Sequence, residues 1–195
     1  SDRSLAFAEQ AGSRIGGLNI WRFAQKPLTI YLRDRYGADA LEYPLFGPRA
    51  GVTFSRFMLR NGGDDWPATM LRDPLAEAIA EGQIKNPTLA YRPVSLFING
   101  AYWGIHNMRE RFDEQFFLSH FGVAPSQYTH IEWVAVESIQ LFEDRFELAA
   151  ANGSLAEYLS FESALSAVDM ALASSFAAVQ AAMDLDNFID FLAVE

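Results

Sequence analysis

The stretch RNGGDDWPATMLRD, residues 60–73, places turn-forming and charged residues between two segments of regular pattern. The letters that end on the same Arg60, VTFSRFMLR, have the apolar and aromatic content of a β-strand. Asn61, Gly62 and Gly63 follow directly, and glycine accepts positive φ at no steric cost. The stretch therefore predicts a sharp corner between a strand and a helix.

The helix that this corner introduces ends near Gly82 and has its apolar residues on one stripe. Asp73 and Pro74 form a good N-cap and first-turn pair, but the stripe begins earlier. We therefore expect the helix to start near Pro67 and to bend at Pro74. The residues of the predicted stripe are Leu71, Leu75, Ala78 and Ile79.

The charges at the corner have two interpretations. In the first, Asp64 and Asp65 cap the turn and pair with Arg60 and Arg72, which adds little stability when such pairs are exposed. In the second, glycine amides and arginines bind a phosphate while the aspartates hold its cation. The pattern alone leaves both open.

Composition limits the class of protein. The chain has 195 residues, half of them hydrophobic, which is enough for one sizeable core or for two small lobes that share a cleft. Its net charge of -10 argues against binding to nucleic acid. No cysteine is present, so disulfides, thiolate metal sites and cysteine nucleophiles are excluded. The letters contain neither a signal-peptide pattern nor a long apolar run, and we expect no membrane span.

The chain changes character along its length. Residues 1–138 mix short alternating segments with turn signals, which predicts a sheet-rich lobe with a few helices. Residues 139–195 are rich in Ala, Leu and Glu, which predicts consecutive helices. The predicted fold class is α+β, with two lobes of one domain.

Lys26 stands out in the first lobe. The segment around it predicts a strand, a turn at Gly16 and Gly17, and a second strand running to about Arg33. In a regular strand Lys26 shares the apolar side with Leu28, where an unpaired charge is costly. It therefore needs an anionic partner, unless it extends to solvent past the following proline.

A β-hairpin is the clearest local structure. Asn99 and Gly100 separate two β-rich runs and place Phe97 opposite Tyr102. Trp103 alternates with an isoleucine on the second strand, which favours core packing over exposure.

A short helix is expected after the hairpin, with Asp113 as its N-cap, Phe112 and Phe117 as a hydrophobic staple, and Gly122 as its end. The cluster Arg109, Glu110 and Arg111 before it has the pattern of a solvated or paired surface. The three histidines have no metal-ligand spacing, and no G-x-S-x-G motif supports a serine hydrolase.

Three motifs occur in an order that resembles one known family. They are RIGG followed by QKPLTIYLRDRYG, then FMLRNGGDDW with LRDPLAEA, then YRPVSLFINGAYWGIHNMRERFDEQFF. Together they resemble the CotH family of spore-coat-protein-H-like atypical kinases, strongly over residues 11–122. The later DLDNFIDFL resembles the segment that leads to the family's catalytic motif. The resemblance implies a reduced protein-kinase-like fold that transfers a phosphoryl group from ATP, with Mg or Mn, to a protein Ser or Thr hydroxyl.

The resemblance also assigns roles to residues. Lys26 would be the lysine of the nucleotide lobe, Gly16 and Gly17 would belong to the phosphate cover, and Arg60 would help to hold phosphate. The acidic partner of Lys26 would be Asp73 or Glu77 from the helix after the corner, or else Glu110.

The family's catalytic Asp, its paired Asn residues and its second Asp-rich metal motif have no counterpart before Glu195. The resemblance therefore implies that the catalytic and main metal-binding residues lie beyond residue 195, in a longer protein. The alternative is a non-catalytic module of the same fold that binds a protein or carbohydrate partner through aromatics such as Trp66, Tyr102 and Trp103. By resemblance the location would be a bacterial spore surface, the envelope or the exterior. The sequence gives no sign of the oligomeric state.

Overall fold

The computed structural model describes residues 4–16, 23–47, 53–135 and 146–194. The chain divides into two compact units: unit 1 is Ser1–Glu81 with Pro87–Val123, and unit 2 is Gly82–Asn86 with Ala124–Glu195. Strands and helices are both present, so the predicted α+β class is confirmed.

Unit 1 is built on an antiparallel sheet of five strands in the order β1-β2-β5-β7-β6. Its strands are β1 (Gly12–Ile15), β2 (Leu28–Tyr31), β5 (Arg56–Arg60), β6 (Tyr91–Ile98) and β7 (Ala101–Arg109). The short strands β3 (Leu41–Glu42) and β4 (Thr53–Phe54) pair separately. The core of the unit is formed by Leu32, Leu41, Leu45, Phe54, Phe57, Leu59 and Met108.

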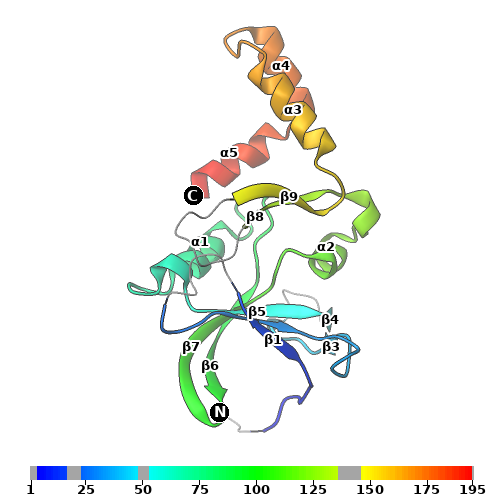
Figure 1. The fold of residues 1–195 in the computed structure, drawn as a ribbon. Coiled ribbons are helices and arrows are strands. Elements are labelled where there is room, and N and C mark those ends of the chain that lie inside the picture. The colour runs from blue at the N-terminus through cyan, green and yellow to red at the C-terminus, as the bar shows by residue number, and fades with distance from the viewer. Residues whose placement is uncertain (1–3, 17–22, 48–52, 136–145, 195) are drawn as a thin grey trace. The chain divides into compact units, whose positions relative to one another are not determined.

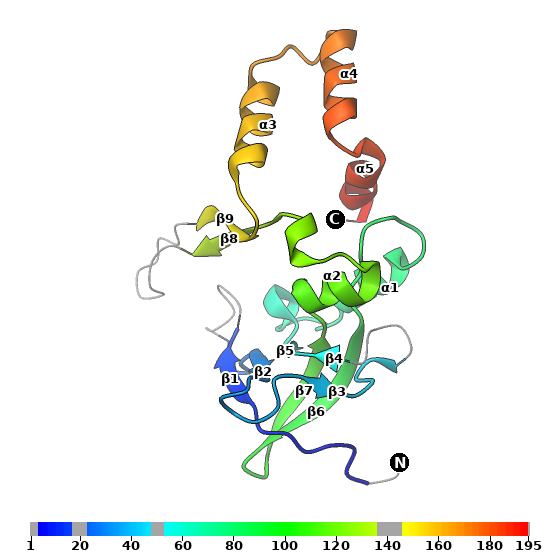
Figure 2. The same cartoon turned by 90° about the vertical axis from the view of Figure 1, so that its right-hand side faces the viewer.

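The helices of unit 1 are α1 (Arg72–Ala80) and α2 (Glu114–Phe121). Both lie at the end of the sheet opposite the tip of the β6–β7 hairpin (Figures 1 and 2). The corner prediction is confirmed, because β5 leads through a 3-10 turn (Gly63–Asp65) to α1. The expected start near Pro67 is wrong, however, since α1 begins at Arg72 with Leu71 at the N-cap position.

The apolar stripe of α1 is not part of the core. Leu71, Leu75 and Ile79 are each more than half exposed. Helical spacing of apolar residues shows which side chains share a face, but it does not show that another element covers that face.

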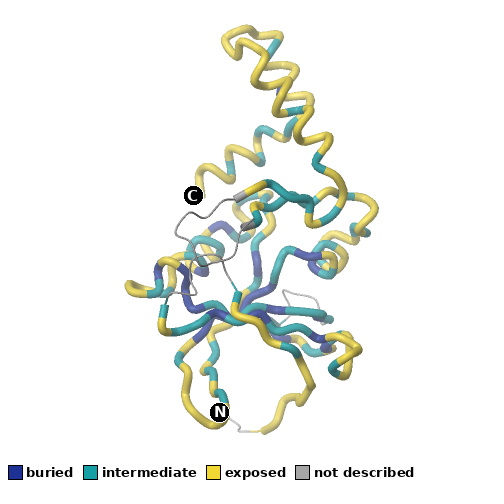
Figure 3. Tube along the Cα trace, in the orientation of Figure 1, coloured by how far each residue is buried: buried dark blue, intermediate teal, exposed yellow. Residues whose placement is uncertain are grey.

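The β6–β7 hairpin and α2 follow the sequence closely. Asn99 and Gly100 have φ values of 51° and 81°, and Phe97 pairs with Tyr102. Trp103 is 41% exposed, so its predicted core packing is wrong. The reason is that this end of the hairpin extends beyond the strands that carry the core, as the exposed residues near its tip show (Figure 3).

The predicted caps of α2 are confirmed. The carboxylate of Asp113 accepts a hydrogen bond from the backbone N–H of Phe116 at 3.0 Å, and Gly122 ends the helix with φ 66°. The rings of Phe112 and Phe117 stack with their centroids 6.3 Å apart.

The described residues of unit 2 form a two-stranded antiparallel sheet and three helices. The strands are β8 (His130–Ala135) and β9 (Phe146–Asn152), the helices are α3 (Ala156–Ser166), α4 (Ala173–Ala182) and α5 (Leu185–Val194), and a 3-10 turn covers Pro125–Gln127. The helical prediction is wrong for Phe146–Asn152, because this Ala-rich segment pairs with β8. Helix propensity is a weak preference that strand pairing overrides.

The net negative charge of the chain comes from unit 2. Thirteen Lys and Arg balance thirteen Asp and Glu in unit 1, whereas unit 2 has two against twelve. The electrostatic argument against nucleic acid therefore applies to unit 2 and not to unit 1. Within the described ranges, no helix is long and apolar enough to cross a membrane.

Candidate functional site

The corner after β5 depends on two glycines in the left-handed region. Gly62 has φ 97° and Gly63 has φ 62°. A Cβ atom on Gly62 would lie 2.9 Å from the Cα of Met70, so the chain passes too close here for any side chain. The amide of Asn107 on β7 also donates to the carbonyl of Met70 at 2.9 Å. The turn is therefore fixed against the sheet.

Asp65 organises the start of α1 from seven residues away. Its carboxylate accepts hydrogen bonds from the Thr69 hydroxyl at 2.5 Å and from the backbone N–H groups of Leu71 and Arg72 at 3.0 and 3.1 Å. These bonds, led by that of Thr69, lower the pKa of Asp65 to about 2. Asp65 also lies 3.9 Å from the Arg72 guanidinium. The capping interpretation is thus confirmed for Asp65, and Asp73 takes the first turn of α1 instead of the N-cap.

Two arginines from the sheet hold the acidic residues of α1. The Arg60 Nη2 lies 2.7 Å from Asp73 Oδ2, and the Arg109 Nη1 lies 3.3 Å from the same oxygen. Arg109 also binds Glu77 through Nη2, and the second oxygen of Glu77 accepts the backbone N–H of Leu89 at 2.6 Å. We call Arg60, Arg109, Asp73 and Glu77 the α1 clamp. Two cations and two carboxylates make the clamp close to neutral.

Burial leaves part of each clamp arginine without a partner. Arg109 is 3% exposed, and among the described residues neither its Nε nor that of Arg60 has a hydrogen-bond partner. Burial lowers the pKa of Arg60, and the nearby Asp73 carboxylate opposes this shift. A buried N–H donor of this kind is satisfied by an incoming oxygen of a ligand or of water.

Lys26 does not lie in a strand. It is half-buried and precedes β2 by two residues, and its Nζ donates to the carbonyl of Phe23 at 2.5 Å. The regular strand from which its inward direction was predicted therefore starts after it. The backbone N–H of Gly16 donates to the carbonyl of Pro27 at 3.0 Å, which places Gly16 beside this segment. Gly17 lies outside the described residues.

Glu110 belongs to a different group of contacts. It is buried, and its carboxylate accepts the backbone N–H of Ala90 at 2.9 Å and lies 2.8 Å from His120 Nε2. The structure thus brings Arg60, Asp73 and Glu77 together and gives Glu110 other partners.

Sequence reasoning missed Arg109, because a charged residue at the end of an exposed hairpin resembles a surface residue. Its pairing with Met58 across β5 and β7 carries it into the interior.

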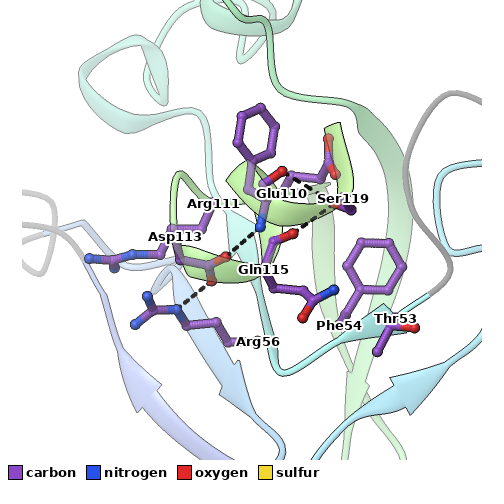
Figure 4. A pocket seen from close by; sticks show the side chains of 9 residues that line it. Thr53, Phe54, Arg56, Glu110, Arg111, Asp113, Gln115 and Ser119 are labelled. Carbon is purple, nitrogen blue, oxygen red and sulfur yellow. Dashed lines mark hydrogen bonds and ion pairs between the residues drawn. The ribbon is translucent and has the colours of Figure 1, made fainter. Parts of the chain in front are cut away.

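A small pocket lies beside α2 (Figure 4). Arg56 Nε donates to Asp113 Oδ2 at 2.6 Å, and the other oxygen of Asp113 caps α2. The same figure shows Ser119 donating to the carbonyl of Gln115. Because both oxygens of Asp113 are already engaged, this pocket serves the packing of α2 better than it serves a ligand. Its lining residues are Thr53, Phe54, Arg56, Glu110, Arg111, Asp113, Gln115, Phe116 and Ser119.

No metal site was found in the part of the chain that the structure describes, since no three His, Asp or Glu side chains there are grouped to hold an ion.

Comparison with known families matches residues 14–195 to the CotH kinase protein family. The chain therefore belongs to this family, as its motifs predicted. Neither the curated proteins nor the solved structures gave a match.

Proposed function

We propose that this chain supplies the nucleotide-binding part of a CotH-like kinase that transfers the γ-phosphoryl group of ATP to a Ser or Thr hydroxyl of a protein. In that reaction the hydroxyl oxygen forms a bond to phosphorus, the bond between phosphorus and the bridging oxygen of ADP breaks, and a general base of the kinase accepts the hydroxyl proton. The observation that carries the proposal is the family match over residues 14–195.

The arrangement around α1 supports this function. Protein kinases require an ion pair between a cation of the nucleotide lobe and an acidic residue of the helix that follows its strand. Here α1 follows β5 through the glycine corner, and Arg60 and Arg109 hold Asp73 and Glu77 on that helix. The clamp would fix α1 in the orientation that the reaction needs, with arginine in place of lysine in the ion pair.

Lys26 would then meet the phosphates. The charges of Arg60 and Arg109 are largely balanced by the carboxylates of the clamp, so these arginines offer N–H donors more than net charge. Lys26 lies beside Gly16, which belongs to the predicted phosphate cover. Mg or Mn would accompany ATP, but the described residues do not form a site for it, and we assign no step to a metal.

An affinity-labelling experiment tests the nucleotide site directly. The chain contains two lysines, Lys26 and the exposed Lys85 of unit 2, so Lys85 is an internal control. An acyl-phosphate derivative of ATP transfers its acyl group to a lysine amine close to the bound phosphates. We expect Lys26 to be labelled, free ATP to suppress the labelling, and Lys85 to react slowly whether or not ATP is present. Equal labelling of both lysines without protection by ATP would contradict the proposal.

A second candidate is a non-catalytic module that binds a protein or carbohydrate partner. It is favoured by the exposed aromatics of the β6–β7 hairpin, where Phe97 and Tyr102 are about 60% exposed and Trp103 is 41% exposed. Trp66 does not belong to this group, because its Nε1 donates to the Gln25 side chain at 3.0 Å. Glycan and protein arrays probed with the wild type and with a Tyr102→Ala, Trp103→Ala variant would test it. This candidate fails if the two proteins give the same binding pattern.

A further inference from the structure

A buried polar network joins three segments that are distant in sequence. Gln25 precedes β2, Asn61 begins the corner, and His106 lies on β7. His106 and Asn61 have no exposed surface at all. Buried polar side chains are costly unless they are hydrogen-bonded, so such a cluster fixes the backbone that it contacts.

The partners of His106 determine its tautomer. Its Nε2 lies 3.0 Å from the carbonyl oxygen of Lys26, which only accepts, so Nε2 carries the proton. Its Nδ1 is then an acceptor for the side-chain amide of Gln25, whose nitrogen lies 3.2 Å away. The same nitrogen donates to the carbonyl of Ile105 at 2.6 Å, and the Gln25 Oε1 accepts the Trp66 indole N–H. Every polar atom of the Gln25 side chain is therefore engaged.

Asn61 completes the hold on this segment. Its amide donates to the carbonyl of Gln25 at 2.7 Å, and its own side-chain oxygen accepts the backbone N–H of Gly63 at 3.1 Å. Two consecutive carbonyls, those of Gln25 and Lys26, are thus bound by fully buried side chains. Asn61 thus links the corner that starts α1 to the backbone of Lys26, and Trp66 adds a second link through the side chain of Gln25.

The hairpin leaves room for this arrangement. Gly104 on β7 has φ 98°, and a Cβ there would lie 3.1 Å from the Gln25 side chain. The ring of Trp66 packs on that of Phe23 with centroids 5.3 Å apart, and the carbonyl of the same Phe23 accepts a hydrogen bond from the Lys26 ammonium. The backbone of Gln25 and Lys26, the ring of Trp66 and the ammonium of Lys26 are therefore held in the same region of unit 1.

We propose that Gln25, Asn61 and His106 are positioning residues for Lys26. They act by fixing the backbone from which its side chain extends, and they couple that backbone to the start of α1. The role assigned to Lys26 rests on the proposed function, whereas the effect of the network on Lys26 does not. A lysine on a fixed backbone loses less freedom when an anion binds, which favours affinity.

The first experiment measures the ¹³C NMR signal of the labelled Lys26 side chain. Reductive methylation with ¹³C-formaldehyde labels the amines of the two lysines and of the N-terminus, and Lys85 gives the signal of an exposed lysine. The nearly isosteric Gln25→Glu variant keeps an acceptor for Trp66 but loses the N–H donors to Ile105 and His106. We expect the Lys26 signal to narrow and to shift toward that of Lys85, whose signal stays unchanged. Gln83→Glu, the same change at an exposed site, is the matched control and should alter neither signal.

A second variant and a ligand comparison complete the test. His106→Phe removes both ring hydrogen bonds and should change the Lys26 signal in the same direction, with folding checked by circular dichroism. We expect Gln25→Glu to weaken ATP binding about tenfold and to leave adenosine binding unchanged, because adenosine has no phosphate for Lys26. An unchanged Lys26 signal in folded Gln25→Glu protein overturns the inference. If the wild type does not bind ATP, the proposed function fails, and the Lys26 signal still decides the inference.

Discussion

Two turns of unit 1 share the letters Asn-Gly but differ in burial and in how closely other residues pack against them. At the hairpin tip, Asn99 and Gly100 are exposed, and a Cβ on Gly100 would meet nothing within 4 Å. At the corner, Asn61 is fully buried, and a Cβ on Gly62 would strike the backbone of Met70. The first turn reverses a strand, whereas the second is part of the network that holds Lys26. The difference shows that a turn signal predicts backbone conformation but not what the turn is packed against.

The largest expected difference between the turns comes from their glycines. Gly62→Ala adds a left-handed strain and a clash with the Met70 backbone, and we expect it to lower the free energy of unfolding by about 3 kcal/mol or more. Gly100→Ala adds strain alone, about 1 kcal/mol. Urea denaturation of both variants measures this difference. Similar losses in the two variants would mean that the corner is no more tightly packed than the hairpin tip.

The second largest difference is expected between the two asparagines, Asn61 and Asn99, in the stability that is lost when each is replaced by alanine. Asn61→Ala leaves the buried carbonyl of Gln25 and the N–H of Gly63 without their partner, so we expect a loss of about 2 kcal/mol. Asn99→Ala removes only the tolerance of asparagine for φ 51° and should cost about 1 kcal/mol. Thermal unfolding at neutral pH compares the two. A larger loss for Asn99→Ala would contradict the network.

The corner should respond to acid through Asp65. Its pKa is lowered from the ordinary 3.8 to about 2, so the ionised form stabilises the fold above about pH 4 and this contribution is lost as the pH falls toward 2. In Asp65→Asn, this part of the acid dependence disappears, and the variant is less stable than the wild type at neutral pH. Melting temperatures measured from pH 7 to pH 2 should therefore converge at the acid end. Parallel curves would exclude Asp65 as the titrating group.

The smallest effect is expected on the exposed hairpin. The rings of Phe97 and Tyr102 pack with centroids 5.3 Å apart, and cross-strand pairs of this kind contribute about 0.5 kcal/mol. Phe97→Ala should therefore lower stability only slightly and leave the Lys26 signal unchanged. A large loss of stability would show that the hairpin tip is covered in solution.

The sequence was a good guide wherever neighbouring residues decide the structure. The pairing of Phe97 with Tyr102 at the hairpin tip, the Asp113 cap, the end of α2 at Gly122 and the strand-corner-helix order all follow from local hydrogen bonds and allowed φ values. The sequence was a poor guide where contacts between residues distant in the chain decide the structure. Phe146–Asn152 looks helical by composition and forms a strand because β8 pairs with it, and Trp103 alternates like a core residue on a part of the hairpin that carries no core.

The candidate site likewise has a part that the sequence predicts and a part that depends on long-range contacts. The motifs singled out seven residues, and their roles in nucleotide binding stay predictions: Gly16, Gly17, Lys26, Arg60, Asp73, Glu77 and Glu110. Which carboxylate meets which cation was beyond the sequence, because these pairs join residues more than ten positions apart. The structure pairs Asp73 and Glu77 with arginines, one of which, Arg109, the motifs did not indicate.

The sequence by itself determined the family, the α+β class and the places where the backbone must turn, because motif order and glycine positions are local properties of the chain. Only the tertiary structure decided that the same Asn-Gly letters make an exposed tip in one place and a buried junction in the other. The physical reason is that burial and hydrogen-bond partners depend on which distant strands meet. Asn61 acquires its role because β2, β5 and β7 lie side by side, which brings Gln25 to Asn61 and His106 to Gln25.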